Sequence, residues 1–352
     1  MLILITGGAG FVGSHLALRL KKEFPEKQVV AFDNLKRRGS ELNLTRLRES
    51  GVEFVHGDIR QPGDLDFKNV EWILECSAEP SALAGIDGAT DYLVHTNLLG
   101  TYHCLELSRK NNAGMIFLST SRVYPVKKIQ ELQYRSGNTR FELEGKQELP
   151  GVSSMGISED FPLEGARTLY GTTKLASELM IAEYAENFGL SMIINRCGVL
   201  TGPWQMGKVD QGVVVLWMAK HLFGGNLSYI GYEGSGFQVR DMLHIEDLGD
   251  LIELQLNQPE HYHGGTFNVG GGIEISTSLL ELTEWCEKIT GKSIPIQRKP
   301  EARPGDVPWF ITDSTLIQNH CGWKPKRNLE TILKEIHHWM DSYQDQLRPI
   351  LS

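Results

Sequence analysis

Tyr170 and Lys174 are the pair of residues in this sequence whose types and spacing best fit acid–base chemistry. They lie four residues apart in Leu169–Phe188, which reads as a helix, and residues four apart share one helix face. A free tyrosine is a poor base near neutral pH because its pKa is near 10, whereas a neighbouring cation lowers that pKa. Such pairs also occur by chance on helix surfaces, so this assignment depends on the rest of the site.

The hydroxyl cluster Ser119-Thr120-Ser121 ends a predicted strand and adds a second candidate element. Hydroxyl groups at the carboxyl edge of a strand lie where open α/β sheets bind ligands. An ordinary Ser/Thr turn after a strand is the alternative. Thr120 therefore joins Tyr170 and Lys174 as a candidate catalytic residue.

The segment TGGAGFVGS, from Thr6 to Ser14, lies between a predicted strand and a predicted helix. Gly7 permits a tight turn, Gly10 lets the backbone approach a pyrophosphate, and Gly13 lets the helix pack closely on the strand. The helix N-terminus then presents unpaired N–H groups to negative charge. These features predict a dinucleotide site, although tight turns also use glycine for steric reasons alone.

Asp33 makes the dinucleotide prediction more specific. It ends the second predicted strand twenty residues beyond Gly13, where a carboxylate can accept both ribose hydroxyls and would repel a 2′-phosphate. NAD is therefore favoured over NADP. The cations Lys36-Arg37-Arg38 are either ligands for that phosphate or part of a solvated loop. Asp58, after the third strand, either faces the adenine or is an exposed turn aspartate.

The elements that must position these residues alternate along the first half of the chain. The apolar runs that predict strands are Leu2–Thr6, Gln28–Asp33, Glu53–His56, Trp72–Cys76, Met115–Ser119 and Met192–Arg196. The stretches that predict helices are Val12–Lys22, Ser40–Glu49, Tyr92–Lys110 and Leu169–Phe188. Strands separated by helices imply parallel pairing with right-handed crossovers. The predicted fold class is α/β, a Rossmann-type doubly wound parallel sheet with a smaller C-terminal substrate domain.

The length of 352 residues suggests two cores on one chain. We expect an NAD-binding domain over 1–200 and a mostly substrate-binding domain over 201–352, with 242–256 as a candidate segment that returns to the first domain. The polar stretch from Pro125 to Ala166 is longer than an ordinary connection, and such loops are usually functional or mobile.

Composition excludes several other classes of protein. The chain is 41% hydrophobic and 22% charged, which is typical of globular proteins, and its formal net charge of -9 gives no reason to expect nucleic-acid binding. Leu2–Ile5 is too short for a signal-peptide core or a transmembrane helix, so we expect no membrane association. The five scattered cysteines lack zinc-ligand spacing and suit a reducing cytosol, so we expect a cytoplasmic protein. His261 and His263, beside glycines, indicate a loop, and no metal site is expected.

Together these motifs resemble the extended short-chain dehydrogenase/reductase family, and within it the nucleotide-sugar epimerases and dehydratases. The segments that carry the resemblance, in the family's order, are TGGAGFVGS, Asp33, Asp58, Thr120, Tyr170-x-x-x-Lys174, RDMLHIEDL from Arg240 and GWKP from Gly322. The resemblance implies that Tyr170 is the base, that Lys174 orients it and binds the nicotinamide ribose, and that Thr120 hydrogen-bonds the reacting hydroxyl. The cofactor-binding residues that it implies are Gly7, Gly10, Phe11, Val12, Gly13, Asp33, Asn34, Asp58, Ile59, Ser77, Ala78, Asn97, Tyr170 and Lys174.

In this family NAD stays bound and takes a hydride from a sugar carbon, and the other acids and bases present decide the outcome. The 4,6-dehydratases have Thr-Asp-Glu before Val-Tyr, whereas this chain has Thr120-Ser121-Arg122 there. The carboxylates that would serve elimination are therefore missing, and so is the glutamate usual in a decarboxylase of the family. The resemblance thus favours simple epimerisation through a transient keto-sugar.

The finer resemblance is to the CDP-paratose 2-epimerase (tyvelose epimerase) branch, which implies a CDP-hexose substrate and oxidation at C2. The segments that carry it are the long insert before Tyr170, SRVYP from Ser121, INRCGVLTGPWQ ending at Gln205, Asp210-Gln211-Gly212, and GFQVRD at 236–241. The expected substrate-binding residues are Ser121, Arg122, Gln205, Gln211, Gln238, Arg240 and Arg303, of which the last two would bind the diphosphate through their planar donor forks. Val199 stands where many relatives have Asn, so that diphosphate contact is absent or supplied elsewhere.

Several alternatives stay open at the level of sequence. They are a UDP-glucose 4-epimerase-like enzyme, another NAD-dependent nucleotide-sugar oxidoreductase or dehydratase, a dehydrogenase that releases NADH, and a non-catalytic nucleotide sensor. A sensor would be expected to show a damaged Tyr/Lys pair or a basic face. The family also implies a homodimer through Tyr92–Lys110 and Leu169–Phe188, although core packing explains amphipathic helices equally well.

Overall fold

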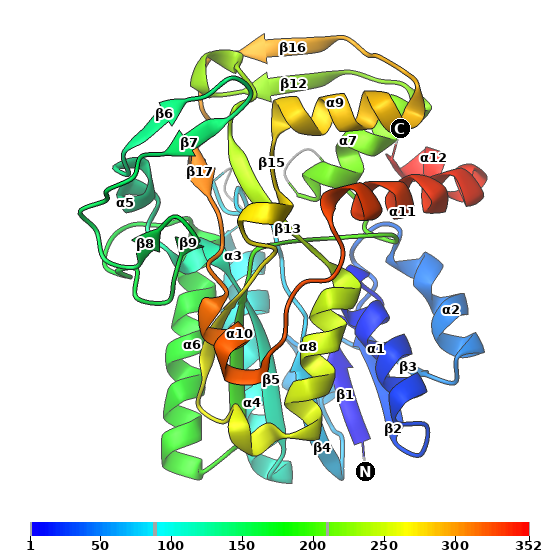
Figure 1. Cartoon of the computed structure of the whole chain (residues 1–352). Coiled ribbons are helices and arrows are strands. Elements are labelled where there is room, and N and C mark those ends of the chain that lie inside the picture. Colours follow the sequence, from blue (N-terminus) through cyan, green and yellow to red (C-terminus); the bar gives the residue numbers. More distant parts are fainter. Residues whose placement is uncertain (1, 87–89, 209–210, 352) are drawn as a thin grey trace. The chain divides into compact units, whose positions relative to one another are not determined.

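The computed structural model of the chain describes residues 2–86, 90–208 and 211–351 (Figure 1). It divides into two compact units. Unit 1 comprises Met1–Val123, Leu169–Arg196 and Leu248–Phe267, and unit 2 comprises Tyr124–Thr168, Cys197–Asp247 and Asn268–Ser352. The expected NAD-binding domain, 1–200 with 242–256 as a returning segment, differs from unit 1, which lacks Tyr124–Thr168 and regains Leu248–Phe267.

Unit 1 is built on a seven-stranded sheet with the strand order β14-β10-β5-β4-β1-β2-β3. Its strands are β1 (Leu2–Thr6), β2 (Gln28–Asp33), β3 (Glu53–His56), β4 (Val70–Glu75), β5 (Gly114–Thr120), β10 (Met192–Cys197) and β14 (Thr266–Val269). β1 pairs in parallel with both β2 and β4, and the next pairs outward, β2 with β3 and β4 with β5, are also parallel. The strand order reverses between β1 and β4, and open α/β sheets bind ligands at such a switch point. The predicted Rossmann-type doubly wound α/β fold is confirmed.

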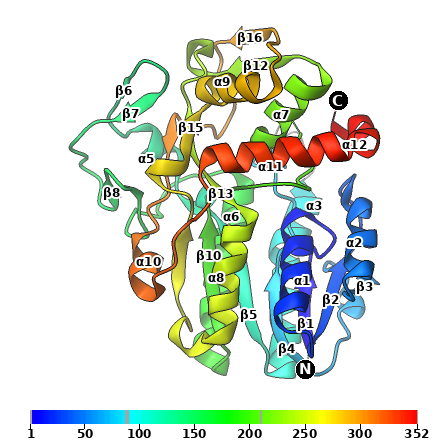
Figure 2. The same cartoon turned by 45° about the vertical axis from the view of Figure 1, so that its right-hand side comes forward.

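Helices cover both faces of this sheet. They are α1 (Phe11–Glu23), α2 (Asn43–Glu49), α4 (Gly100–Asn111), α6 (Leu169–Phe188) and α8 (Ile245–Asn257). Figures 1 and 2 show α1 and α8 side by side on one face, with α4 and α6 on the other. Arg19 of α1 forms ion pairs with Asp250 and Glu253 of α8, which tie the two helices on the first face together.

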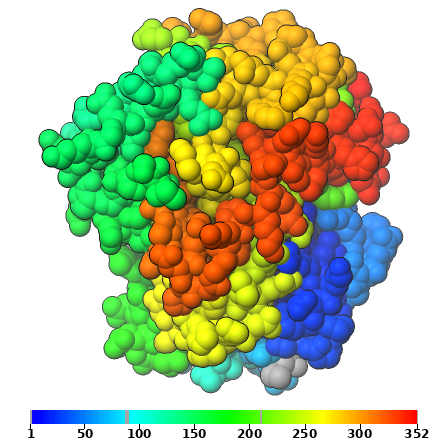
Figure 3. Space-filling model, in the orientation of Figure 1, coloured from blue at the N-terminus to red at the C-terminus, as the bar shows by residue number. Residues whose placement is uncertain are grey.

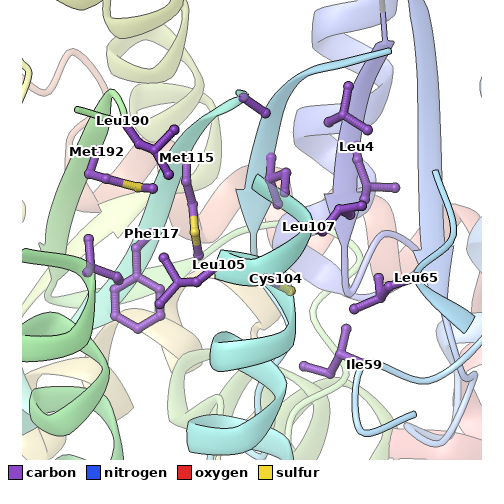
Figure 4. Close-up of a cluster of buried hydrophobic side chains, with 14 of the residues drawn as sticks. Leu4, Ile59, Leu65, Cys104, Leu105, Leu107, Met115, Phe117, Leu190 and Met192 are labelled. Carbon is purple, nitrogen blue, oxygen red and sulfur yellow. The ribbon is translucent and has the colours of Figure 1, made fainter. Parts of the chain in front are cut away.

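The face covered by α4 and α6 holds a continuous apolar core (Figure 4). Leu105 and Leu107 of α4 pack there with Met115 and Phe117 of β5 and with Met192 of β10. Burying one such side chain contributes roughly 1.5–3 kcal/mol, so this core fixes β5 and the helices beside it. Those elements carry the candidate catalytic residues.

The segment predicted as one helix, Tyr92–Lys110, is interrupted in the structure. In its place the chain forms α3 (Thr90–Val94), a π-helical turn (His95–Leu99) and then α4. π-helical turns occur frequently at functional sites, and this one carries Asn97.

Unit 2 contains short sheets and helices. Its strands are β6 (Tyr134–Ser136), β7 (Phe141–Leu143), β8 (Val152–Ser153), β9 (Gly156–Ile157), β11 (Val199–Thr201), β12 (Leu227–Ile230), β13 (Val239–His244), β15 (Ser276–Ser278), β16 (Ile296–Lys299) and β17 (Trp309–Phe310). Its helices are α5 (Val126–Gln130), α7 (Val213–Phe223), α9 (Leu279–Thr290), α10 (Thr315–Cys321), α11 (Leu329–Ser342) and α12 (Gln344–Leu351). The helices α9, α10 and α11 lie at the surface on the face shown in Figure 3.

The long insert between Pro125 and Ala166 is folded and anchored within unit 2. It supplies α5 and the hairpins β6–β7 and β8–β9. The N–H of Phe141 donates to the carbonyl of Phe237 at 3.0 Å. Arg140, in the β6–β7 turn, forms an ion pair with Glu281, the capping-box residue of α9. These contacts explain why the insert belongs to unit 2 although its neighbours in sequence belong to unit 1.

No helix among the described residues combines the length and the apolar character needed to cross a membrane.

Candidate functional site

The glycine-rich turn joins β1 to α1 with almost no room for side chains. Gly7 has φ +64, and a Cβ there would lie 2.9 Å from the carbonyl carbon of Cys76 at the end of the neighbouring strand β4. A Cβ on Gly13 would lie 2.2 Å from the carbonyl oxygen of Gly7. Gly10 is the N-cap of α1, and no side chain caps this helix. The N-terminus of α1 is therefore not capped by a side chain, and such a terminus favours an anion; Phe11 and Val12 form the first turn of that helix.

Asp33 ties the glycine turn to the end of β2. One carboxylate oxygen accepts the N–H of Ala9 at 3.1 Å and the other accepts the N–H of Leu35 at 2.7 Å. Burial raises the pKa of Asp33, while the N–H groups of Leu35, Ala9 and Gly10 oppose that shift. The structure thus brings the predicted ribose ligand directly beside the predicted pyrophosphate turn.

Asp58 and Asn34 also meet, across the ends of β3 and β2. The Asn34 amide donates to Asp58 at 3.0 Å, and the Arg60 guanidinium forms an ion pair with the same carboxylate at 2.5 Å. Burial alone would raise the pKa of Asp58, but the hydrogen bonds from Arg60 and Asn34 lower it to about 2. Asp58 is therefore an anion at every physiological pH.

Lys36 and Ile59, two residues that the sequence singled out, have clear contacts in the structure. The ammonium of Lys36 lies 3.5 Å from the centre of the Tyr92 ring, a cation–π contact. The side chain of Ile59 lies in the core, and its carbonyl oxygen is 2.7 Å from Nδ1 of His103. Ile59 thus contributes packing beneath this edge of the sheet.

Asn97 forms hydrogen bonds with the segment that follows β4, where Ser77 and Ala78 lie. It is fully buried. Its side-chain oxygen accepts the N–H of Glu79 at 2.8 Å, and its amide donates to the carbonyl of Glu79 at 3.1 Å. The same amide lies 3.4 Å from the hydroxyl of Thr173 in α6. Asn97 therefore joins the loop after β4 to the helix that carries Tyr170 and Lys174.

Tyr170 and Lys174 both lie on the buried side of α6, and Lys174 is 2% exposed. The Lys174 ammonium donates to the carbonyl of Leu118 in β5 at 2.9 Å and lies 4.2 Å from the centre of the Phe117 ring. Thr120 ends the same strand, and its hydroxyl accepts the N–H of Arg122 at 3.2 Å. Strand β5 is thus the element that brings Thr120 to the Tyr170–Lys174 helix, and Ser121 and Arg122 open the short turn that follows it.

Sequence reasoning missed a buried ion pair behind these residues. Glu178 forms an ion pair with Arg196 of β10 at 2.7 Å, and the two side chains are 5% and 8% exposed. Ser119 donates its hydroxyl proton to the same carboxylate at 2.5 Å. Glu178 lies four residues beyond Lys174, so the helical spacing that singled out Tyr170 and Lys174 extends to it.

The predicted substrate residues of unit 2 have well-defined partners. The Arg240 guanidinium donates to Asp306 at 2.9 Å and to the carbonyl of Val307 at 2.7 Å. The N–H of Asp306 in turn donates to the carbonyl of Arg303. The structure therefore brings Arg240 to the loop that carries Arg303.

The glutamines predicted to bind substrate also form hydrogen bonds within the protein. Gln205 donates to the carbonyl of Leu200 at 2.9 Å and accepts the hydroxyl of Thr201 at 3.1 Å. Gln238 donates to the carbonyl of Ile230 at 2.6 Å. Gln211 is bound through its backbone to Lys208, while its neighbour Asp210 lies outside the described residues.

Asp241, next to Arg240, is another residue whose structural role sequence reasoning missed. It is 1% exposed and accepts hydrogen bonds from the backbone of Thr312 at 3.1 Å and of Gly271 at 2.8 Å. It therefore holds two loops of unit 2 together. Among the described residues, no group of three or more His, Cys, Asp or Glu side chains is arranged to hold a metal ion.

Comparisons with known proteins agree with this arrangement. The family model described as the NAD dependent epimerase/dehydratase family matches residues 3–270. The chain is 31% identical to CDP-paratose 2-epimerase of Salmonella typhi, over 97% of this chain and 100% of that one, and 28% identical to UDP-glucose 4-epimerase of Bacillus subtilis, over 97% of each. It also resembles the crystal structure of the dTDP-glucose 4,6-dehydratase DesIV from Streptomyces venezuelae with NAD and TYD bound, with a TM-score of 0.81 and 26% identity, over 99% of this chain and 100% of that one.

Proposed function

This chain belongs to the NAD dependent epimerase/dehydratase family, and on that premise we propose that it is a CDP-hexose 2-epimerase. The prediction of an NAD-dependent enzyme of the nucleotide-sugar epimerase and dehydratase group is confirmed. The narrower proposal concerns the nucleotide, the sugar and the carbon at which the configuration changes.

One observation carries the choice of epimerisation over elimination. The two residues after Thr120 are Ser121 and Arg122, so this turn offers no carboxylate to remove a proton from the sugar or to protonate a leaving hydroxyl. The CDP nucleotide and the C2 position are supported by the 31% identity to CDP-paratose 2-epimerase over nearly the full length of both chains.

The cofactor residues fit NAD on structural grounds. The turn at Gly7 and Gly13 has no space for a Cβ, and α1 presents its N-terminus there without a capping side chain. We propose that the pyrophosphate lies on this turn, that Asp33 accepts the ribose hydroxyls, and that Asp58 and Asn34 border the adenine. When bound, NAD supplies the hydride acceptor that oxidises the sugar and later returns the hydride.

In the proposed mechanism the residues of the protein transfer one proton and bind the sugar nucleotide. Tyr170 removes the proton of the reacting hydroxyl, and Thr120 hydrogen-bonds the same oxygen. Lys174 stabilises the phenolate of Tyr170 by its charge, and its contacts with Leu118 and Phe117 hold the ammonium in place. We propose that Arg240 and Arg303 bind the diphosphate and that Gln205, Gln211, Gln238, Ser121 and Arg122 contact the remainder of the substrate.

Incubation of the pure protein with CDP-paratose, CDP-glucose and UDP-glucose, followed by NMR assignment of the products, tests this proposal. We expect inversion at C2 of a CDP-sugar. Conversion of UDP-glucose to UDP-galactose with no reaction of either CDP-sugar would instead establish a UDP-glucose 4-epimerase. The similarity to the Bacillus subtilis enzyme makes that the second candidate.

We also propose that the enzyme is a homodimer that buries the outer surfaces of α4 and α6. Large apolar side chains are exposed on this part of unit 1, namely Leu99 (41%), Tyr102 (42%), Phe188 (51%) and Leu179 (65%). Apolar side chains gathered on neighbouring helices are typical of a protein–protein contact.

A further inference from the structure

Glu75 is a buried carboxyl group behind the proposed catalytic pair that the mechanism above does not use. It is the last residue of β4, and its neighbours in the sheet are Thr6 of β1 and Phe117 of β5. Its side chain is 0% exposed. Phe117 is also the ring on which the Lys174 ammonium rests, so Glu75 and Lys174 share one neighbour.

The hydrogen bonds around Glu75 decide its protonation state. The hydroxyl oxygen of Thr101 lies 3.0 Å from Oε2 of Glu75 and 2.8 Å from the carbonyl oxygen of Asn97. A threonine hydroxyl has only one proton to donate. An ionised Glu75 would therefore compete with Asn97 for that proton. A neutral Glu75 can donate to Thr101, which then donates to Asn97, so that both contacts are made.

The other carboxyl oxygen leads to the same conclusion. Within the part of the chain that the structure describes, Oε1 of Glu75 is buried and has no hydrogen-bond partner. A buried charged oxygen without a partner is much more costly than a neutral carbonyl oxygen in the same place. Burial raises the pKa of Glu75, and the charge of Lys174 and the hydrogen-bond contact with Thr101 oppose that shift only in part.

The titratable groups that interact with Glu75 come from the two helices packed on this face of the sheet. They are Lys174 of α6 and Cys104 of α4. Burial raises the pKa of the Cys104 thiol well above its ordinary value, so Cys104 is neutral. Of these two groups, Lys174 is therefore the one that carries a charge near Glu75 and the active centre.

We propose that Glu75 is a positioning residue: a neutral carboxylic acid that donates through Thr101 to Asn97 and so fixes the turn beside Tyr170 and Lys174. The inference rests on the proposed roles of those two residues. Asn97 transmits the effect to α6, because its amide lies 3.4 Å from the hydroxyl of Thr173 and its carbonyl oxygen lies 3.0 Å from the hydroxyl of Ser177, which is equally close to the carbonyl of Thr173. A neutral Glu75 does not offset the charge of Lys174, so the effect of that charge on the pKa of Tyr170 is kept.

Three variants of the NAD-loaded enzyme test the proposal: Glu75→Gln, Glu75→Leu and Thr101→Val. Glutamine can donate to Thr101 as the acid does, so we expect kcat within about twofold of the wild type and an unchanged acid limb of the kcat–pH profile. Leucine at 75 or valine at 101 breaks the chain of donors, and we expect the loss of one such hydrogen bond to lower kcat by about tenfold. KM for the nucleotide sugar should change little in either variant.

Infrared spectroscopy provides a readout that is independent of turnover. The wild type near neutral pH should show the carbonyl stretch of a protonated carboxyl group that shifts in D2O and is absent from Glu75→Gln. If no nucleotide sugar is turned over, the proposed function fails, and this band still decides the state of Glu75.

Three results would overturn the inference. The first is the absence of the protonated-carboxyl band. The second is an acid limb that moves to lower pH in Glu75→Gln, because removing a true negative charge would lower the pKa of Tyr170. The third is equal kcat in Glu75→Leu, Thr101→Val and the wild type, which would leave Glu75 no positioning role. If Glu75→Leu fails to fold, Thr101→Val and the infrared band still decide.

Discussion

Lys174 shows how single residues of this site combine charge with a fixed position. Its ammonium is nearly excluded from solvent, yet it keeps one hydrogen bond to Leu118 and a contact with the face of Phe117. A buried cation held in this way acts strongly on a neighbouring phenol, because little water screens it. The role proposed for Tyr170 therefore depends on contacts that Lys174 makes with β5.

Replacing Tyr170 by phenylalanine separates catalysis from cofactor binding. The change removes only the hydroxyl, so we expect kcat to fall by about 10²–10⁴-fold while NAD stays bound through gel filtration. Gly13→Ala is the contrasting variant, because its Cβ would lie 2.2 Å from the carbonyl oxygen of Gly7; it should lose NAD. Turnover by Tyr170→Phe at near the wild-type rate would remove tyrosine from the mechanism.

Sequence reasoning found the residues whose spacing along the chain carries information. Tyr170 and Lys174 are one helical turn apart, and Gly13 and Asp33 follow a fixed separation along a βαβ unit. Glu75 gave no such signal, because its partner Thr101 and its neighbour Lys174 come from distant segments. Which long-range neighbours surround a lone carboxyl can be established only from the fold.

At the scale of elements, α6 is attached to the sheet by the ion pair between Glu178 and Arg196. Ser119 joins the same carboxylate, so α6, β5 and β10 meet at one buried point. Glu178 is one turn beyond Lys174 on the helix. A change in this ion pair therefore affects the placement of the helix relative to the strand that carries Thr120.

Arg196→Met tests this attachment. The variant leaves the Glu178 carboxylate buried without its cation, and breaking such a pair costs about 3–5 kcal/mol in the free energy of unfolding. Arg135→Met is the control, since Arg135 is 70% exposed in its ion pair with Glu142; exposed pairs contribute about 1 kcal/mol or less. Chemical unfolding of both variants measures the difference. Equal losses of stability in the two variants would show that the buried pair contributes no more to the free energy of unfolding than the exposed pair.

Most strands and helices of unit 1 could be predicted, because short apolar runs alternate with amphipathic segments. β1, β2, β3 and α6 have the bounds expected from sequence. The π-helical turn His95–Leu99 could not be predicted, since nothing in the pattern of apolar residues distinguishes it from continuous helix. The insert between Pro125 and Ala166 was also beyond sequence reasoning, because its order depends on contacts with Phe237 and α9.

At the scale of the whole molecule, the apolar surface of α4 and α6 predicts the oligomeric state. Leu179 is 65% exposed on α6, and burying one leucine side chain contributes roughly 1.5–3 kcal/mol. In a two-fold dimer each change enters the interface twice. Leu179→Glu should therefore convert the proposed dimer to a monomer, measured by light scattering against the chain mass of 39.5 kDa.

Leu316→Glu is the matched control, because Leu316 is 47% exposed on α10 of unit 2 and should leave the dimer intact. A wild type that is monomeric at all concentrations, or a Leu179→Glu variant that stays dimeric, would contradict the proposed interface.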